Sequence, residues 1–190
     1  MSEVLYNGPM FNEPKLVHIK CEHWDAKKKI LLKLKERGDK VSRVQEEGHI
    51  KTDYHYQVKE NLFFYNKHLA DILEIELQSF CDCIGVKSGK VTNAWFETSV
   101  RNAHHGIHNH GGNGYSAVCF VEYNPEQHTA TKFLSPSLSA LDNEPLIGSP
   151  KVEEGDILFF PSNVPHYTLP VESDEVRSIL SWNMRINDDD

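Results

Sequence analysis

A turn, an apolar strand and a proline-bounded loop follow one another in Glu154-Gly-Asp-Ile-Leu-Phe-Phe-Pro-Ser-Asn-Val-Pro-His166. Gly155 and Asp156 are typical of the turn before a strand, and two prolines bound the loop after it. The segment therefore predicts a strand whose following loop presents His166.

Similar short runs of β-branched and aromatic residues recur after Gly89, with Gly, Pro, Asn and Asp between them. Runs at such spacing are typical of a sandwich, a jelly roll or a small barrel. The predicted strands lie at about 91–100, 104–110, 115–123, 130–134, 151–152, 156–160, 166–169 and 176–186.

The half of the chain before Gly89 is predicted to be mainly helical. Its predicted elements are a strand at 15–20, a helix at 23–37, loop or short strand at 39–60, and a helix from an Asn66 N-cap to about Gly85. We expect a single domain, 1–190, of the mainly β class with flanking helices. Residues 1–90 would form a helical support, and residues 91–186 would form the core with the functional site.

The charge and the cysteines exclude several classes of protein. The 190 residues include 28 acidic and 20 basic side chains, and the resulting net charge of −8 disfavours nucleic acid as a partner. No window reaches the ~18–20 apolar residues of a membrane span, and residues 1–12 lack the pattern of a secretory signal. The four cysteines follow no disulfide framework. We expect a cytoplasmic protein with reduced thiols and no membrane partner.

Histidine is enriched, with 11 residues in the chain. In His108-Asn-His110 the two imidazoles are two positions apart, so on a strand they project from one face, about 6–7 Å apart at Cα. They can bind one metal ion, and His166 is the candidate for a third ligand. Three ligands on one side of a metal leave positions open for a substrate or dioxygen, as in a catalytic site.

The remaining histidines are expected to have surface or structural roles. His104 shares the strand face of His108 but lies roughly 13 Å away along a strand, and His105 is predicted to point to the opposite face. The histidines expected on the surface or hydrogen-bonded in the core are His18, His23, His49, His55, His68 and His128.

Arg177 follows His166 by 11 positions and lies near the start of the strand Val176-Arg-Ser-Ile-Leu-Ser-Trp-Asn183. A guanidinium can bind a carboxylate through two parallel hydrogen bonds, so an inward Arg177 would suit an organic acid held beside the metal. The alternative is a surface ion pair with Asp174 or Glu175.

Together these motifs resemble the iron(II)- and 2-oxoglutarate-dependent oxygenase superfamily, and most of all a His-x-His group found in marine bacteria and phages. The likeness covers about residues 91–186. It rests on the order and spacing of Asn93-Ala-Trp-Phe96, His108-Asn-His110, Ser116-Ala-Val118, Phe133-Leu-Ser-Pro136, Gly155-Asp156, Pro165-His166, and Arg177 with Ser181 and Asn183. A phage-encoded member would act in the host cytoplasm.

The resemblance implies a double-stranded β-helix, the jelly-roll or cupin-like fold, and a dioxygenase. His108, His110 and His166 would bind Fe(II), and Arg177 would hold the distal carboxylate of 2-oxoglutarate, with Ser181 and Asn183 in the same cofactor site. The enzyme would use dioxygen, release succinate and CO2, and hydroxylate a small molecule or a protein side chain.

Two positions depart from the superfamily pattern. His110 stands where an aspartate or glutamate is usual, so three neutral imidazoles make the site more positive by one unit and give up the affinity that a carboxylate contributes. Ile179 stands where many members have a serine, and Tyr115, Ser181 or another hydroxyl would supply that hydrogen bond instead.

Two other functions compete with this one. A cupin-type three-histidine metalloenzyme that does not use 2-oxoglutarate has a similar His-x-His strand, but cupins normally place a glutamate a few residues further on, and here the next acid is Glu122. A non-catalytic metal-binding protein would keep the fold without turnover. The segments 39–60 and 135–150 are predicted to be lids that select the substrate.

Overall fold

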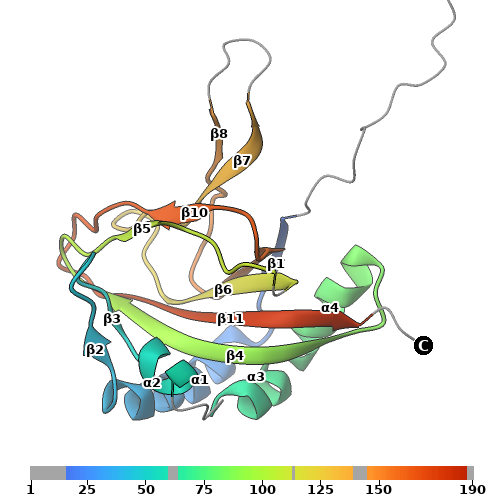
Figure 1. The fold of residues 1–190 in the computed structure, drawn as a ribbon. Helices are drawn as coiled ribbons and strands as arrows, with labels where there is room; N and C mark the ends of the chain where they lie inside the picture. Colours follow the sequence, from blue (N-terminus) through green and yellow to red (C-terminus); the bar gives the residue numbers. More distant parts are fainter. Residues whose placement is uncertain (1–15, 60–63, 113, 139–144, 188–190) are drawn as a thin grey trace, which may run out of the picture.

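The computed structural model describes residues 16–59, 64–112, 114–138 and 145–187. Two antiparallel sheets face each other, and the helices cover the outer face of the larger sheet (Figure 1). This arrangement is a double-stranded β-helix, and the predicted mainly β class with flanking helices is confirmed.

Both sheets join strands that are distant in the sequence. The larger sheet has the order β1 (Val17–Lys20), β9 (Asp156–Pro161), β6 (Tyr115–Glu122), β11 (Arg177–Asn187), β4 (Ser88–Ser99), β3 (Lys51–Thr52) and β2 (Arg43–Val44). The smaller sheet has the order β5 (His105–His108), β10 (His166–Thr168), β7 (Lys132–Leu138) and β8 (Pro145–Gly148). The helices are α1 (Trp24–Asp39), α2 (Tyr54–Lys59), α3 (Asn66–Ile72) and α4 (Glu74–Ile84).

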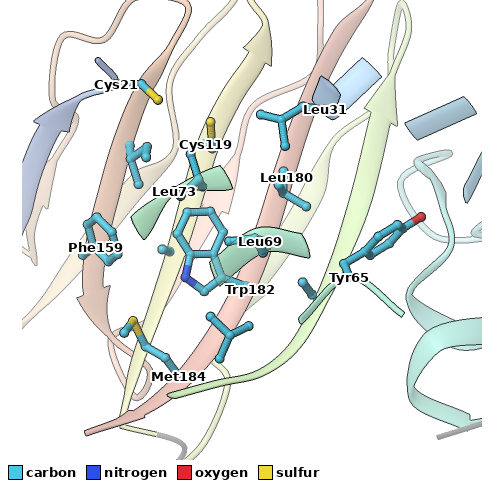
Figure 2. Close-up of a cluster of buried hydrophobic side chains, with 14 of the residues drawn as sticks. Cys21, Leu31, Tyr65, Leu69, Leu73, Cys119, Phe159, Leu180, Trp182 and Met184 are labelled. Carbon is cyan, nitrogen blue, oxygen red and sulfur yellow. The ribbon is translucent and has the colours of Figure 1, made fainter. Parts of the chain in front are cut away.

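Side chains of the larger sheet alternate between two cores, because successive residues of a strand point to opposite faces. Leu180 and Trp182 of β11 pack in the outer core, between the larger sheet and the helices (Figure 2). In the same core, Phe159 of β9 stacks on Phe80 of α4 with ring centroids 4.3 Å apart. Ile179 of β11 packs instead in the inner core, between the sheets. The alternation therefore turns residues 177, 179, 181 and 183 inward.

The predicted helix at 66–85 is two helices. Leu73 is fully buried and adopts φ −109° and ψ 25°, which ends α3 and begins α4. The predicted N-cap is also wrong, since Tyr65 occupies that position and Nδ2 of Asn66 donates to the Thr92 carbonyl oxygen at 2.7 Å. A tertiary contact to the sheet thus replaces the local cap.

Residues 39–60 contain the expected short strands, β2 and β3, and also α2, which was not predicted. The carboxylate of Asp53 accepts hydrogen bonds from the Phe96 amide at 2.8 Å and from the Tyr65 hydroxyl, and it anchors α2 to the larger sheet.

The lid predicted at 135–150 contains the end of β7 and all of β8. Residues 151–152, which were predicted to form a strand, lie in the described segment 145–187 but form no strand there. Residues 139–144 of that lid, and residues 1–12, lie outside the described part of the chain. Within that part, no helix has the length and apolar character needed to cross a membrane.

Candidate metal centre

Three histidines of the smaller sheet and its flanking loop meet between the two sheets. Strands β5 and β10 pair so that His108 lies opposite His166, and His110 follows β5 by two residues. A ring nitrogen of each of these three histidines lies within 4.8 Å of the corresponding atoms of the other two. The structure thus brings together the three predicted metal ligands.

Each of the three rings is oriented by a hydrogen bond at Nδ1. Nδ1 of His108 lies 2.8 Å from the Gly106 carbonyl oxygen, and Nδ1 of His166 lies 2.9 Å from the Val164 carbonyl oxygen. Nδ1 of His110 lies 2.7 Å from Oδ1 of Asn183. A carbonyl oxygen accepts a hydrogen bond from a protonated Nδ1, which leaves the lone pair on Nε2, so Nε2 of each ring is the candidate metal-ligand atom.

The three imidazoles are held in the neutral form. Burial, reinforced by repulsion from neighbouring histidines, lowers the pKa of His108 to about 4 and that of His166 to about 3. Burial also lowers the pKa of His110. Because a metal binds the neutral imidazole, the set is ready for a cation at neutral pH.

Arg177 points into the space between the sheets. It is 2% exposed, and Nε and Nη2 have no hydrogen-bond partner among the described residues. Burial lowers its pKa. The alternative of a surface ion pair is wrong, because Asp174 pairs with Arg101 and Glu175 accepts from Asn124. A buried guanidinium with two unpaired nitrogens fits a carboxylate ligand.

The predicted hydroxyl donors lie on opposite sides of the larger sheet. Ser181 is buried and lines a small cavity of about 20 Å³ together with His108, His110 and His166. Tyr115 packs against Phe80 in the outer core, with ring centroids 5.0 Å apart. Adjacent residues of a strand face opposite ways, so Ser116 rather than Tyr115 points toward His110, and the structure places Tyr115 outside the site.

A larger cavity of about 330 Å³ opens beside the histidines. It is bounded by Tyr54 and Trp95, whose rings meet edge to face at 4.9 Å, and by polar groups at its rim. The residues lining it are Gln45, Tyr54, Trp95, Glu97, His105, His108, Asn109, His110 and Asn183. Part of the predicted lid 39–60 therefore does border the site.

The prediction that His105 and His108 point to opposite faces is wrong. Their rings stack with centroids 3.9 Å apart and planes at 21°. Four residues of β5 lie opposite three of β10, since His105 pairs with Thr168 and His108 pairs with His166. This bulge breaks the simple alternation of faces.

Glu97 on β4 was not predicted to lie in the site. Its Oε1 accepts a hydrogen bond from Nε1 of Trp95 at 2.8 Å, and its Oε2 lies 3.5 Å from Nδ1 of His105. Burial opposes its ionisation, but these two partners hold the pKa of Glu97 at about 2. One signal could have found it, namely a carboxylate two residues after Trp95 and so on the same strand face.

The fold and the site define the class of double-stranded β-helix proteins with a candidate metal centre. Residues 93–183 match the family described as "Putative 2OG-Fe(II) oxygenase", and this segment contains all three histidines, Arg177, Ser181 and Asn183. The resemblance seen in the sequence is confirmed at the level of the family, whose enzymes are oxidoreductases. No curated protein matches the sequence of the chain.

Solved structures resemble this chain over nearly its whole length. They include a prolyl-4-hydroxylase from Pseudomonas putida, with 13% identity, a TM-score of 0.56 and coverage of 90% of this chain and 92% of that one. HygX from Streptomyces hygroscopicus, solved with nickel and 2-oxoglutarate, has 12% identity and a TM-score of 0.60, with coverage of 92% of this chain and 84% of that one. The epimerase SnoN from nogalamycin biosynthesis, solved with Fe3+ and alpha ketoglutarate, has 10% identity and a TM-score of 0.62, with coverage of 90% of this chain and 79% of that one. At these identities the likeness establishes the fold.

Proposed function

We propose that the protein is an Fe(II)- and 2-oxoglutarate-dependent dioxygenase that hydroxylates its substrate and releases succinate and CO2. His108, His110 and His166 would bind the metal, and Arg177 would bind the distal carboxylate of 2-oxoglutarate. The proposal is carried by the buried Arg177, whose two unpaired nitrogens face inward on the same strand as Asn183, the partner of His110.

The residues of the site fit these two cofactors. Three neutral imidazoles suit a divalent first-row metal, and the guanidinium suits an anion. When bound, iron and 2-oxoglutarate would supply the chemistry that activates dioxygen. The chain itself orients the three rings and keeps water away from Arg177, which lies 5.8 Å from the ring of Phe120. Because the dielectric constant is lower where water is excluded, the attraction between guanidinium and carboxylate is stronger there than in water. Ser181 would donate to the 2-oxoglutarate carboxylate the hydrogen bond that a serine at position 179 provides in many members of the superfamily.

The cavity of about 330 Å³ beside the histidines would receive the substrate. Its size suits a small molecule or one side chain of a protein, with Tyr54 and Trp95 as an apolar wall and Gln45 and Asn109 as polar contacts. The structural neighbours include both a prolyl hydroxylase and an enzyme solved with hygromycin B. A cytoplasmic location and membership of the marine and phage group stay predictions.

The test is an anaerobic titration of metal-free protein with Fe(II) and then with 2-oxoglutarate. The wild type is expected to develop the weak visible charge-transfer band of iron chelated by the keto acid. His166→Ala should bind no iron, whereas Arg177→Ala should bind iron but give no band at the same 2-oxoglutarate concentration. Arg185→Ala is the control, because Arg185 is an exposed arginine of the same strand.

Two outcomes would contradict the proposal. Iron binding without any 2-oxoglutarate binding by calorimetry would favour a three-histidine cupin. A band without consumption of 2-oxoglutarate under air, across a panel of small-molecule and peptide substrates, would favour a non-catalytic metal-binding protein.

A further inference from the structure

The three histidines provide no negative charge to balance a divalent cation. Neutral imidazoles bring no negative charge to the metal, and the guanidinium of Arg177 adds a positive one to the same interior. A divalent ion placed there needs an anion in the surrounding protein, because electrostatic interactions are screened weakly inside a protein.

Glu97 is the one acidic residue, among those the structure describes, that lines either cavity at the histidines. It is 7% exposed and lies on the inward face of β4, paired in register with Ile179 of β11. Both cavities that it lines are also lined by His108 and His110. Its carboxylate is therefore held beside the candidate ligands without belonging to the ligand set.

Glu97 keeps acceptor capacity beyond its neighbours, although the ion pair with His105 engages part of its charge and, outweighing burial, raises the pKa of His105. Trp95 donates one neutral hydrogen bond at 2.8 Å, and the contact with Nδ1 of His105 is 3.5 Å long. A carboxylate has about four acceptor positions, so this one keeps capacity to stabilise further positive charge. A buried carboxylate with so few partners costs folding free energy, which points to a role in the site.

We propose that Glu97, positioned by Trp95 and His105, supplies from outside the ligand set the negative charge that His110 does not provide, and so raises the affinity of the three histidines for a divalent cation. This inference rests on the proposed function of the same site. The same negative charge repels the anion 2-oxoglutarate. Glu97 therefore raises the affinity for the cation and lowers the affinity for 2-oxoglutarate.

The experiment compares wild type with Glu97→Gln, which keeps an oxygen acceptor for Trp95 but removes the charge. Calorimetry measures the Kd of metal-free protein for Co(II), and then the Kd of the cobalt-loaded protein for 2-oxoglutarate. We expect the Kd for Co(II) to rise about 10-fold or more, as for partners surrounding a metal site. The Kd for 2-oxoglutarate should stay the same or fall. Glu153→Gln is the control, since Glu153 is an exposed carboxylate that lines neither cavity at the histidines.

Opposite signs separate this role from a structural one. If both affinities fall, Glu97 only maintains the shape of the site, and the inference is overturned. An unchanged Kd for Co(II) overturns it as well. If the wild type binds no Co(II), the proposed function fails together with the inference.

A second variant covers the case in which Glu97→Gln does not fold in metal-free melting experiments. His105→Phe keeps a ring stacked on His108 and keeps the Glu97 carboxylate but removes its ion-pair partner, so the variant should bind Co(II) at least as tightly as wild type. A tenfold loss in this variant would show that His105, and not the carboxylate charge, determines the affinity.

Discussion

Oδ1 of Asn183 lies 2.7 Å from Nδ1 of His110, although the two residues are 73 positions apart. Ser116 lies 2.8 Å from the same nitrogen and donates to Oδ1 of Asn183 at 2.7 Å. The closed network fixes the ring of His110, which lies outside a regular strand. Asn183 thus orients a candidate metal ligand.

Asn183→Ala is expected to weaken metal binding about 10-fold to 100-fold, because the ring of His110 loses its orienting acceptor. The Kd for Co(II) measures the effect. Asn163→Ala is the control, because Asn163 is exposed and lies in the loop before β10. Equal affinities in the two variants would show that Asn183 does not position His110.

Arg177→Met should separate stability from binding. Removing a buried guanidinium with two unpaired nitrogens is expected to raise the free energy of unfolding of the metal-free protein by about 1–3 kcal/mol. The variant should lose the stabilisation by 2-oxoglutarate, which for cobalt-loaded wild type is about 2.7 kcal/mol at 100 times Kd. Urea unfolding with and without 2-oxoglutarate measures both effects. A destabilised variant that still responds to 2-oxoglutarate would contradict the assignment.

Gly48 holds the segment that enters β5. Its φ is +77°, and a Cβ atom built there would lie 1.9 Å from the carbonyl oxygen of His104. Gly48→Ala must therefore displace the segment that carries His105 and His108. Gly85→Ala is a matched control, with φ +78° and no atom within 4 Å of the added Cβ.

We expect Gly48→Ala to lose more stability than Gly85→Ala by about 1–3 kcal/mol, and to weaken Co(II) binding, which the control should leave unchanged. Urea unfolding and metal titration measure the two effects. Similar losses of stability in both variants would mean that only the left-handed backbone matters, and not the contact with His104.

Glu76 makes stability depend on pH. It is 1% exposed, both carboxylate oxygens lie 2.7 Å from Nζ of Lys27, and the Glu22 amide donates to it at 2.8 Å. Burial by itself raises the pKa of Glu76, but these partners outweigh burial and lower it. A lowered pKa in the folded state stabilises the protein above the ordinary pKa of glutamate, and this stabilisation is lost as the pH falls through the folded value.

Glu76→Gln is therefore expected to cost about 1–3 kcal/mol near pH 7, where it leaves the half-buried Lys27 without its partner. The difference from wild type should shrink below about pH 4. Urea unfolding between pH 3 and 8 measures it. Glu153→Gln, in an exposed pair with Lys20, should change stability little at any pH. A difference that does not depend on pH would contradict the role of the ionised pair.

The sequence predicted the elements whose pattern is local. The β-branched and aromatic runs of β4, β6, β9 and β11 and the apolar stripes of the helices need only neighbouring residues to be recognised. The same holds for the His-x-His pair and for His166 after its proline-bounded loop. The break at Leu73 and helix α2 were missed because both depend on contacts with the sheet, through the buried Leu73 side chain and the Asp53 carboxylate.

The sequence alone determined the mainly β class, the metal ligand candidates and the resemblance to the 2-oxoglutarate oxygenases, since these depend on residue type and spacing. Only the tertiary structure decided which side chains share the site. It turned Arg177 inward, placed Tyr115 on the far side of the sheet, and brought Glu97 and His105 beside the histidines. The physical reason is that strand pairing and one bulge in β5 set the direction of each side chain, and both arise between segments far apart in the chain.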